Sequence, residues 1–528
     1  MANSQDCWIR ATAAFDRGDM AAARAESIKL LETESASPRL HWLLGSIELN
    51  SRRFKPALRH AFVASAGAAG LAPLQLTAVT RLLISLGEFE PAHKLLSGLG
   101  TGPALGAALV PIGEQMLMLE QYDSALAALT GARSRGIRHP MVSYLLSNAW
   151  KFTGNLDLAK ESAEDVLQQQ PGFVHAHWSL AQMGDVDGAG QRIDRIRREV
   201  ATLQAAGHAH PGAVTALSVL SYALFRELDR IEDIDAAWQA LSAGMQLRRQ
   251  LRPHSIPDED ALFDRLLDTY TGEFVTQQAE LPLGPQPIFV VGMPRSGTTL
   301  VARIIGNHPE VANCGELNEL QLLVKRTIGY WCPEFIDETC AAAMATADFS
   351  QLGAGYLHSV AWRTRDKARL VDKHQSNFML AGVILRCLPQ ARIIHMRRSP
   401  MDTCFSNLKE LFSLDAYSYS NNQADCAHHF RNYSRLMAQL HRVAPGRILD
   451  VCYEDLVASP DHVTRNLMDF IGLAYQEDLP DITRNVQPVA TASSVQVRSA
   501  LHSRNVGGWQ RYARHLGELE RTLFAGES

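Results

Sequence analysis

Residues Pro287–Leu300, PIFVVGMPRSGTTL, decide the fold of the second half of this 528-residue chain. The apolar run PIFVV predicts a buried β-strand, GMPRSG predicts a loop bounded by glycines, and TTLVARIIGN predicts the start of a helix. A strand, loop and helix in this order direct backbone N–H groups and the positive end of a helix dipole at an anion. The stretch therefore predicts a phosphate-binding loop.

This loop differs from an ATP-binding loop in one residue that matters for its chemistry. Gly292 and Gly297 have the spacing of a P-loop, but Thr298 stands where an ATP-binding loop carries lysine. The cation of the loop is Arg295 instead. A loop without that lysine indicates a donor other than ATP. A kinase or NTPase is one alternative function, and a non-catalytic adaptor with an inactive nucleotide domain is another.

The composition is that of a globular protein with more than one domain, because a chain of this length exceeds the usual size of a single core. A net charge of −5 gives no reason to expect nucleic acid as a partner. The N-terminus does not resemble a signal peptide, and no apolar run reaches the roughly 18–20 residues of a transmembrane segment. The eight cysteines form no CxxC pair, so we expect reduced thiols, no metal and a cytoplasmic protein.

Alanine-containing motifs recur every 33 to 35 residues in the first half of the chain. In each motif a turn and an apolar residue precede a small residue, which would let two helices approach closely. These small residues are Ala23, Ala57, Ala92, Ala125 and Ala159, with a further copy at Ala237. The segment DVDGAGQRIDRIRREV (residues 185–200) breaks the period, and we expect an irregular helical insert there.

The period and pattern resemble the tetratricopeptide repeat (TPR), in which helical hairpins stack into a solenoid. The resemblance implies a concave surface that holds a peptide or protein. The alternative is that the repeats only support the second domain.

Proline and glycine residues interrupt the helical patterns between the repeats and the phosphate-binding loop. We therefore expect a TPR-like helical domain over residues 1–250, a junction over 251–284 and a second domain over 285–528. Short apolar runs alternate with helical patterns in the second domain, which predicts a P-loop-like α/β domain with a parallel sheet. The runs are PIFVV, RLVD, ARIIHM and GRILDVCY (residues 287–291, 369–372, 391–396 and 446–453).

Cations and hydroxyls follow three of these predicted strands. The loop with Arg295 follows the first, Lys373 follows RLVD, and Arg398 with the later Ser406 follows ARIIHM. Ligands of such sheets bind at the carboxyl ends of the strands, and arginine suits phosphate oxygens because it can bind two of them at once. The sequence therefore predicts that these strand ends bind more than one anionic group.

The second half resembles sulfotransferases that use 3′-phosphoadenosine-5′-phosphosulfate (PAPS), of the bacterial type fused to tetratricopeptide repeats. It is also similar to the tyrosylprotein sulfotransferases. The resemblance covers about residues 287–512. The matching motifs, in the order of the family, are PRSGTTL, CGELNEL, DKHQSNF, IIHMRRSPMDTCFSN, YEDLVASP, TASSVQVRS and NVGGWQRY.

The resemblance implies that three groups of residues bind the donor nucleotide. The 5′-phosphosulfate would be held by the loop residues Arg295, Ser296, Gly297, Thr298 and Thr299. The 3′-phosphate would be bound by Arg398 and Ser406. The adenine side and a segment that closes over the nucleotide would be formed by Tyr453, Gln496, Val497 and Arg498.

The resemblance also implies the catalytic residues: Glu316 in CGE as the general base, Lys373 as the residue that stabilises the leaving phosphosulfate oxygen, and Arg295 facing the transferring sulfonate or the acceptor. A carboxylate within hydrogen-bond reach can take the proton of an attacking hydroxyl. Glu319, one helical turn on, and His374 are alternative bases. No carboxylate cluster indicates a divalent ion, so we expect no metal requirement.

Two positions depart from the pattern of the family. His374 and Gln375 replace the Met-Pro or Asp-Pro that commonly follows the lysine, and Gly508 stands where relatives often carry Arg or Lys before the tryptophan. Both concern the acceptor and the lid more than the donor. We expect the acceptor to be a hydroxyl, with a peptide or protein tyrosine favoured and carbohydrate, lipid and small molecules as alternatives.

Overall fold

The structure is a computed structural model. It describes residues 4–100, 103–206, 212–277, 284–364, 366–414, 416–485, 487–490, 494–495, 498 and 501–525. The chain divides into two compact units. The first contains Met1–Arg138, Asn318–Pro333 and Thr346–Trp362, and the second contains His139–Leu317, Glu334–Ala345 and Arg363–Ser528.

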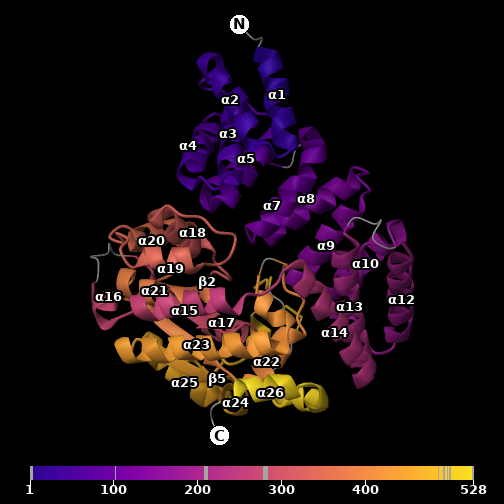
Figure 1. Cartoon of the computed structure of the whole chain (residues 1–528), viewed down its shortest axis with the longest axis vertical. Coiled ribbons are helices and arrows are strands. Elements are labelled where there is room, and N and C mark those ends of the chain that lie inside the picture. Colours follow the sequence, from indigo (N-terminus) through magenta and orange to yellow (C-terminus); the bar gives the residue numbers. More distant parts are fainter. Residues whose placement is uncertain are drawn as a thin grey trace. The chain divides into compact units, whose positions relative to one another are not determined.

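Helical hairpins form most of the first unit (Figure 1). Its helices are α1 (Ser4–Asp16), α2 (Met20–Glu34), α3 (Pro38–Asn50), α4 (Phe54–Ala66), α5 (Pro73–Ser85), α6 (Phe89–Ser97), α7 (Leu109–Met118), α8 (Tyr122–Ser134), α18 (Glu319–Ile328) and α20 (Leu352–Thr364), of which α20 ends just past the boundary of the unit. The predicted alanines of the first four repeats lie in the second helix of their hairpins, and none is exposed. The small side chain at these positions allows the two helices of each pair to pack closely, as the repeat pattern predicts.

Three further helix pairs begin the second unit: α9 (Pro140–Thr153) with α10 (Leu156–Gln169), α11 (Val174–Met183) with α12 (Ala189–Ala206), and α13 (Ala213–Arg230) with α14 (Ile234–Leu251). Ala159 and Ala237 are fully buried, as predicted. The segment expected to be an irregular helical insert is helical from Ala189 on, where residues 189–200 belong to the regular helix α12. The reason is that Ala189, Ile193 and Ile196 recur with helical spacing and form a buried face.

The junction contains α15 (Ile256–Thr269), which begins where the side chain of Ser255 accepts a hydrogen bond from the Asp258 N–H, and α16 (Gly272–Thr276). The division into compact units places the last three helix pairs in the same unit as the sheet. The predicted domain boundaries near residues 250 and 285 are drawn from the end of the repeat pattern and not from compactness, so they stay a prediction.

A parallel five-stranded sheet forms the centre of the second unit, with the strand order β2-β3-β1-β4-β5. The strands are β1 (Gln286–Gly292), β2 (Val311–Asn313), β3 (Arg369–Asp372), β4 (Arg392–Arg397) and β5 (Ile448–Cys452). The four predicted strands and the α/β class are thus confirmed. The sequence did not reveal β2, because three residues are too few to establish an alternating pattern.

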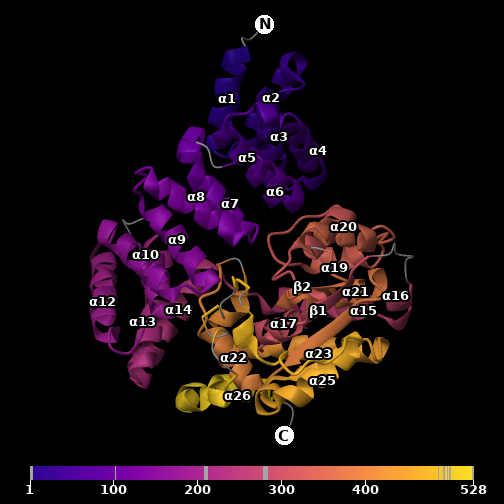
Figure 2. The ribbon, with the colours of Figure 1, turned by 180° about the vertical axis from the view of Figure 1, so that it is seen from behind.

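Helices cover both faces of this sheet. On one face Ile288 and Val290 of β1 share a core with α17 (Thr298–Gly306) and α25 (Pro460–Ile471), and Figure 2 shows α17 beside β1 and β2. On the other face His395 of β4 meets Tyr433 of α23 (Gln423–Val443), with 5.5 Å between the ring centroids. The remaining helices are α19 (Glu338–Met344), α21 (Ala381–Cys387), α22 (Pro400–Leu408), α24 (Tyr453–Ala458) and α26 (Gly517–Leu523). Among all described helices, none combines the length and apolar character needed to cross a bilayer.

Candidate active site

The strand order brings the predicted catalytic and binding residues to one edge of the sheet. Glu316 follows β2, Lys373 follows β3, the loop with Arg295 follows β1, and Arg398 follows β4; these four strands are consecutive in the sheet. The central strand β1 has β3 on one side and β4 on the other, so the connections diverge at its carboxyl end. Open α/β sheets bind their ligands at such a switch point.

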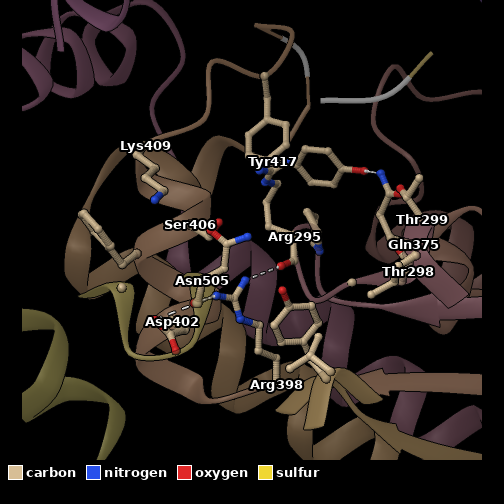
Figure 3. Close-up of a pocket in the computed structure, with 18 of the residues that line it drawn as sticks. Arg295, Thr298, Thr299, Gln375, Arg398, Asp402, Ser406, Lys409, Tyr417 and Asn505 are labelled. Carbon is tan, nitrogen blue, oxygen red and sulfur yellow. Dashed lines mark hydrogen bonds and ion pairs between the residues drawn. The ribbon is translucent and has the colours of Figure 1, made fainter. Parts of the chain in front are cut away.

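A cavity of about 390 Å³ opens at this edge of the second unit (Figure 3). This volume lies in the usual range for small-molecule sites. The predicted residues that line it are Arg295, Gly297, Thr298, Thr299, Glu316, Arg398, Ser406 and Tyr453. The structure thus brings together residues that lie up to 158 positions apart in the chain.

Three of the other predicted residues are described and do not line the cavity. Ser296 and Lys373 are buried and do not line this cavity. Arg498 also lies outside the lining, and its Nη2 donates a hydrogen bond to the Phe152 carbonyl at 2.5 Å. Gln496 and Val497 fall outside the described residues.

Two glycines give the loop after β1 its shape. Gly292 and Gly297 have φ angles of 149° and 109°, in the region that favours glycine. A Cβ atom on Gly292 would lie 2.6 Å from the Met396 carbonyl oxygen, and one on Gly297 would lie 2.8 Å from Cδ2 of Tyr453. Arg295 also has a positive φ of 68°, which costs a residue with a side chain about 1–2 kcal/mol. The loop therefore holds Arg295 in a conformation that its surroundings must impose.

The start of α17 supplies the anion-binding end of the loop. Gly297 is the N-cap residue, and the helix begins at Thr298, which lines the cavity. The first N–H groups of a helix have no partner within the helix, so they attract phosphate oxygens. The Ser296 N–H donates to the Met293 carbonyl at 3.2 Å, so it serves the turn of the loop.

Glu316 and Lys373 form an ion pair in which Lys373 Nζ donates to Glu316 Oε1. The Lys373 side chain is 3% exposed, whereas that of Glu316 is 29% exposed and lines the cavity. The Lys373 N–H also donates to the Gly315 carbonyl at 2.9 Å, which fixes the two loops relative to each other. The predicted base and the predicted leaving-group lysine are therefore direct neighbours.

The two alternative bases occupy different surroundings. Burial lowers the pKa of His374 to about 4, so its imidazole is neutral near pH 7, and its ring packs 5.0 Å from the ring of Phe335. Glu319 begins α18 in the first unit. Neither residue lines the cavity, whereas Glu316 does.

Arg398 is held rigidly at the floor of the cavity, as Figure 3 shows. Its Nη1 donates to the Arg295 carbonyl at 3.1 Å, and its Nη2 donates to the Asn505 carbonyl. The guanidinium carbon lies 4.8 Å above the centre of the Tyr453 ring, and Asp402 Oδ1 is 3.9 Å from Nη2. Stacking on an aromatic ring and hydrogen bonds from both ends fix the plane of this guanidinium group.

Sequence reasoning missed Asp402, which attaches the C-terminal segment to the cavity. Its Oδ2 accepts from the Gly507 N–H at 2.7 Å, and its Oδ1 accepts from the Trp509 N–H at 3.2 Å. Gly508 between them lines the cavity. The carboxylate lies in the first turn of α22, where an acid also interacts favourably with the helix dipole. That position in SPMDTC was the available signal.

Near Glu316 the wall of the cavity contains Gln375, which the sequence marked as a departure from the family, and Tyr417, which sequence reasoning missed. Gln375 Nε2 donates to the Tyr417 hydroxyl at 2.8 Å, and the Ser376 hydroxyl is 3.3 Å from the same oxygen. Burial raises the pKa of Tyr417 to about 12, so it remains a neutral phenol. Tyr417 lies in an irregular segment without a motif, so nothing in the sequence distinguished it.

Outside this cavity, buried His395 lies in a cluster of potential metal ligands with the more exposed His441 and Asp450. His395, His441 and Asp450 each place one ligand atom within 4.8 Å of the others. They are already joined by hydrogen bonds, because Asp450 Oδ1 lies 2.8 Å from His395 Nδ1 and 2.7 Å from His441 Nε2, while His395 Nε2 contacts the Tyr433 hydroxyl. Hydrogen bonding between these side chains accounts for the cluster.

Comparison with known proteins agrees with the geometry. Residues 287–477 match the model of the Sulfotransferase family. An uncharacterized protein of Aquifex aeolicus (strain VF5) is 27% identical over 425 residues, which cover 78% of this chain and 54% of that protein. A putative protein-tyrosine sulfotransferase of Caenorhabditis briggsae is 23% identical over 233 residues, 42% of this chain and 80% of that protein. The chain thus spans about half the length of the Aquifex relative.

Among solved structures, the sulfotransferase domain from the Synechococcus PCC 7002 olefin synthase aligns with a TM-score of 0.32 and 21% identity, over 44% of this chain and 91% of that chain. The sheet order and the cavity described above define the fold here. The chain therefore carries a segment similar to the Sulfotransferase family, residues 287–477, together with helical repeats.

Proposed function

We propose that this protein transfers a sulfuryl group from PAPS to an acceptor hydroxyl. The proposal rests on one observation above all: consecutive strands deliver Glu316, Arg295 and Arg398 to the lining of a single cavity, with Lys373 paired to Glu316. The phosphate-binding loop carries Thr298 in place of the lysine that an ATP-binding loop would have. Two arginines and a helix N-terminus suit a donor with phosphate groups at both the 5′ and the 3′ position.

The proposed reaction is an in-line displacement at sulfur. The acceptor oxygen forms a bond to sulfur as the bond between sulfur and the bridging phosphate oxygen breaks, and Glu316 takes the proton of the acceptor hydroxyl. Negative charge develops on the 5′-phosphate of the departing adenosine 3′,5′-bisphosphate. Lys373, Arg295 and the first amides of α17 would stabilise that charge.

The ion pair between Glu316 and Lys373 suits both roles. Lys373 contacts the carboxylate that takes the proton, and although it does not itself line the cavity, it would turn to contact the leaving oxygen when the donor binds. In phosphoryl transfer, which resembles sulfuryl transfer, positioning and electrostatic stabilisation provide most of the catalysis, because the protein itself has little covalent chemistry to perform.

We favour a peptide or protein tyrosine as the acceptor. Phe412 and Tyr417 line the same cavity as Glu316, and their ring centroids lie 4.8 Å apart. An aromatic acceptor could pack against such rings. The helical repeats would hold the rest of the peptide. Hydroxyls of carbohydrates, lipids and small molecules are the alternatives. A cytoplasmic location is also part of the proposal, because no two of the eight cysteines form a CxxC pair in the sequence.

Calorimetry with the full chain tests the donor. Adenosine 3′,5′-bisphosphate should bind more tightly than ADP or ATP, with or without Mg²⁺, and Arg398→Ala should abolish that preference. Tighter binding of ATP with Mg²⁺, followed by its turnover, would instead establish a kinase or an NTPase.

Radiolabelled PAPS and a pool of tyrosyl peptides test the transfer. Label should pass to the tyrosyl peptides and not to a matched pool with phenylalanine at every tyrosine. If adenosine 3′,5′-bisphosphate binds but no label passes to either peptide pool or to sugar, lipid or phenol acceptors, the protein is a non-catalytic adaptor. Addition of EDTA should leave the transfer unchanged, because no metal is part of the proposed chemistry.

A further inference from the structure

Lys409 is a cation of the cavity with no assigned role. It follows α22 directly and stands three residues after Ser406, so both side chains lie on the same side of the last helical turn and both line the cavity. Figure 3 shows the Lys409 side chain reaching into the cavity beside Ser406. Its Nζ lies 4.9 Å from the centre of the Phe405 ring. Among the described residues, no carboxylate forms an ion pair with this ammonium group.

The charges around Lys409 come from three other elements. Arg226 and Asp229 lie on α13, Arg295 lies in the loop after β1, and Arg398 follows β4. Asp229 is engaged elsewhere, because its Oδ1 accepts from the Tyr512 hydroxyl at 2.8 Å and pairs with Arg511 at 3.2 Å.

Two described carboxylates close in sequence, Glu410 and Asp402, are also engaged. Glu410 pairs with Arg226 at 2.8 Å, and Asp402 accepts hydrogen bonds from two backbone N–H groups of the C-terminal segment. His502 and Asn505 of that segment line the cavity and carry no negative charge at neutral pH. Lys409 therefore adds positive charge to a site that already contains two arginines, and among the described residues no carboxylate forms an ion pair with it.

Such an arrangement is unfavourable unless an anion binds there. Burial lowers the pKa of Lys409 to about 8, and the positive charges of Arg226, Arg295 and Arg398 act in the same direction, while Asp229 opposes them. An ammonium group in these surroundings is stabilised by an anion that brings its own negative charge into the cavity.

We propose that Lys409 is a third residue that binds the 3′-phosphate, together with Arg398 and Ser406. The inference rests on the proposed donor, since PAPS and its product both carry this phosphate. Ser406 would donate a hydrogen bond from its neutral hydroxyl. Arg398 would contribute a guanidinium group that backbone carbonyls already orient, and Lys409 would contribute an ammonium group on a flexible side chain. The lysine makes the site selective for a nucleotide with a 3′-phosphate.

Calorimetry of the full chain with two nucleotides tests the assignment. The wild type should bind adenosine 3′,5′-bisphosphate more tightly than adenosine 5′-monophosphate. Lys409→Gln should weaken binding of the bisphosphate about ten- to hundredfold and change binding of the monophosphate by less than about threefold, because a charge-assisted hydrogen bond to the 3′-phosphate alone is lost. Retained binding of the monophosphate also shows that the variant is folded.

Two further variants serve as controls. Lys160→Gln removes one positive charge from an exposed pair with Asp185 outside the cavity and should leave both affinities unchanged. Lys409→Arg keeps the charge and should retain most of the preference for the bisphosphate.

Proton uptake gives a second readout that a structural role would not produce. Near pH 8 about half of the Lys409 side chains are neutral, and binding of the 3′-phosphate should recharge them, so about 0.5 proton is taken up. At pH 6.5, where the lysine is already charged, the wild type and Lys409→Gln should exchange the same number of protons, which come from the phosphates with their second pKa of about 6. At pH 8 the uptake should be absent in Lys409→Arg and Lys409→Gln. Calorimetry in buffers with different ionisation enthalpies measures this number.

The outcomes separate the two proposals. If the wild type shows no preference for the 3′-phosphorylated nucleotide, the proposed donor is wrong. If the wild type shows that preference and Lys409→Gln retains it, the role of Lys409 is overturned while the proposed donor stands. The same holds if Lys409→Gln lowers the affinity for both nucleotides equally.

Discussion

Arg226 of α13 forms an ion pair with Glu410, with 2.8 Å between Nη2 and Oε2. Glu410 is 2% exposed, and the same oxygen lies 3.9 Å from Nε of Arg295 in the phosphate-binding loop. Arg226 also stacks on Trp178 of α11, 4.9 Å from the ring centre. A residue of the helical repeats thus neutralises the carboxylate that faces Arg295. The last helix pairs therefore help to build the candidate active site of the second unit.

Replacing Arg226 should weaken both the fold and the reaction. Arg226→Gln leaves a buried carboxylate without its counter-ion, which should cost about 1–3 kcal/mol of unfolding free energy. Glu410 should then interact more strongly with Arg295, so the rate of sulfuryl transfer should fall more than the affinity for adenosine 3′,5′-bisphosphate. Thermal unfolding and assays with radiolabelled PAPS measure the two effects.

The matched control is Arg195→Gln, which removes an arginine from a more exposed pair with Glu164 and should cost less than about 1 kcal/mol. In the double variant Arg226→Gln with Glu410→Gln, part of the lost stability should return, because no unpaired charge is buried. Equal losses in the double variant and in Arg226→Gln would show that packing on Trp178, and not the ion pair, is responsible.

Glu316→Gln tests the general base without changing its shape. An amide cannot accept the proton of the acceptor, so transfer from radiolabelled PAPS to the tyrosyl peptide pool should slow about 10²–10⁴-fold. Binding of adenosine 3′,5′-bisphosphate, measured by calorimetry, should change little. Glu319→Gln is the control, since Glu319 does not line the cavity. Loss of transfer in Glu319→Gln with full activity in Glu316→Gln would reverse the assignment.

The sequence predicted features that depend on local pattern. Gly292 and Gly297 mark a loop in which an added Cβ would lie too close to neighbouring atoms, and Ala57 and Ala92 mark fully buried positions in the second helix of their hairpins. Short buried strands with flanking turns were also recognised, because hydrophobic runs and breakers define them within a few residues.

Contacts between distant segments could not be predicted in the same way. The pair between Glu316 and Lys373 joins residues 57 positions apart, and it depends on β2, which is too short to recognise. Lys409 and Tyr417 reach the cavity because of tertiary packing, and their sequence neighbours give no sign of it. Arg498 had an expected role at the nucleotide, whereas the structure places its guanidinium group against the Phe152 carbonyl.

Gly297→Ala should disturb both stability and nucleotide binding. At a φ of 109°, with a Cβ 2.8 Å from the Tyr453 ring, alanine should cost about 1–3 kcal/mol. Movement of Tyr453 would also displace Arg398, which stacks on it, so the bisphosphate should bind more weakly. Scanning calorimetry and isothermal titration measure these effects. Gly355→Ala, in α20 with no atom within 4 Å of the new Cβ, should instead raise stability slightly.

The pH dependence of His374 distinguishes burial from base catalysis. Its pKa is about 4 in the folded protein and near 6.5 when unfolded, so the unfolded chain binds more protons between these values. Stability should therefore fall as the pH decreases from 6.5 to 4, and His374→Gln should make that decrease shallower. His462→Gln, at an exposed position of α25, should leave the slope unchanged. The rate profile of His374→Gln between pH 6 and 8 should match that of the wild type, because this imidazole is neutral throughout. An ionisation in that range that disappears in the variant would make His374 the base in place of Glu316.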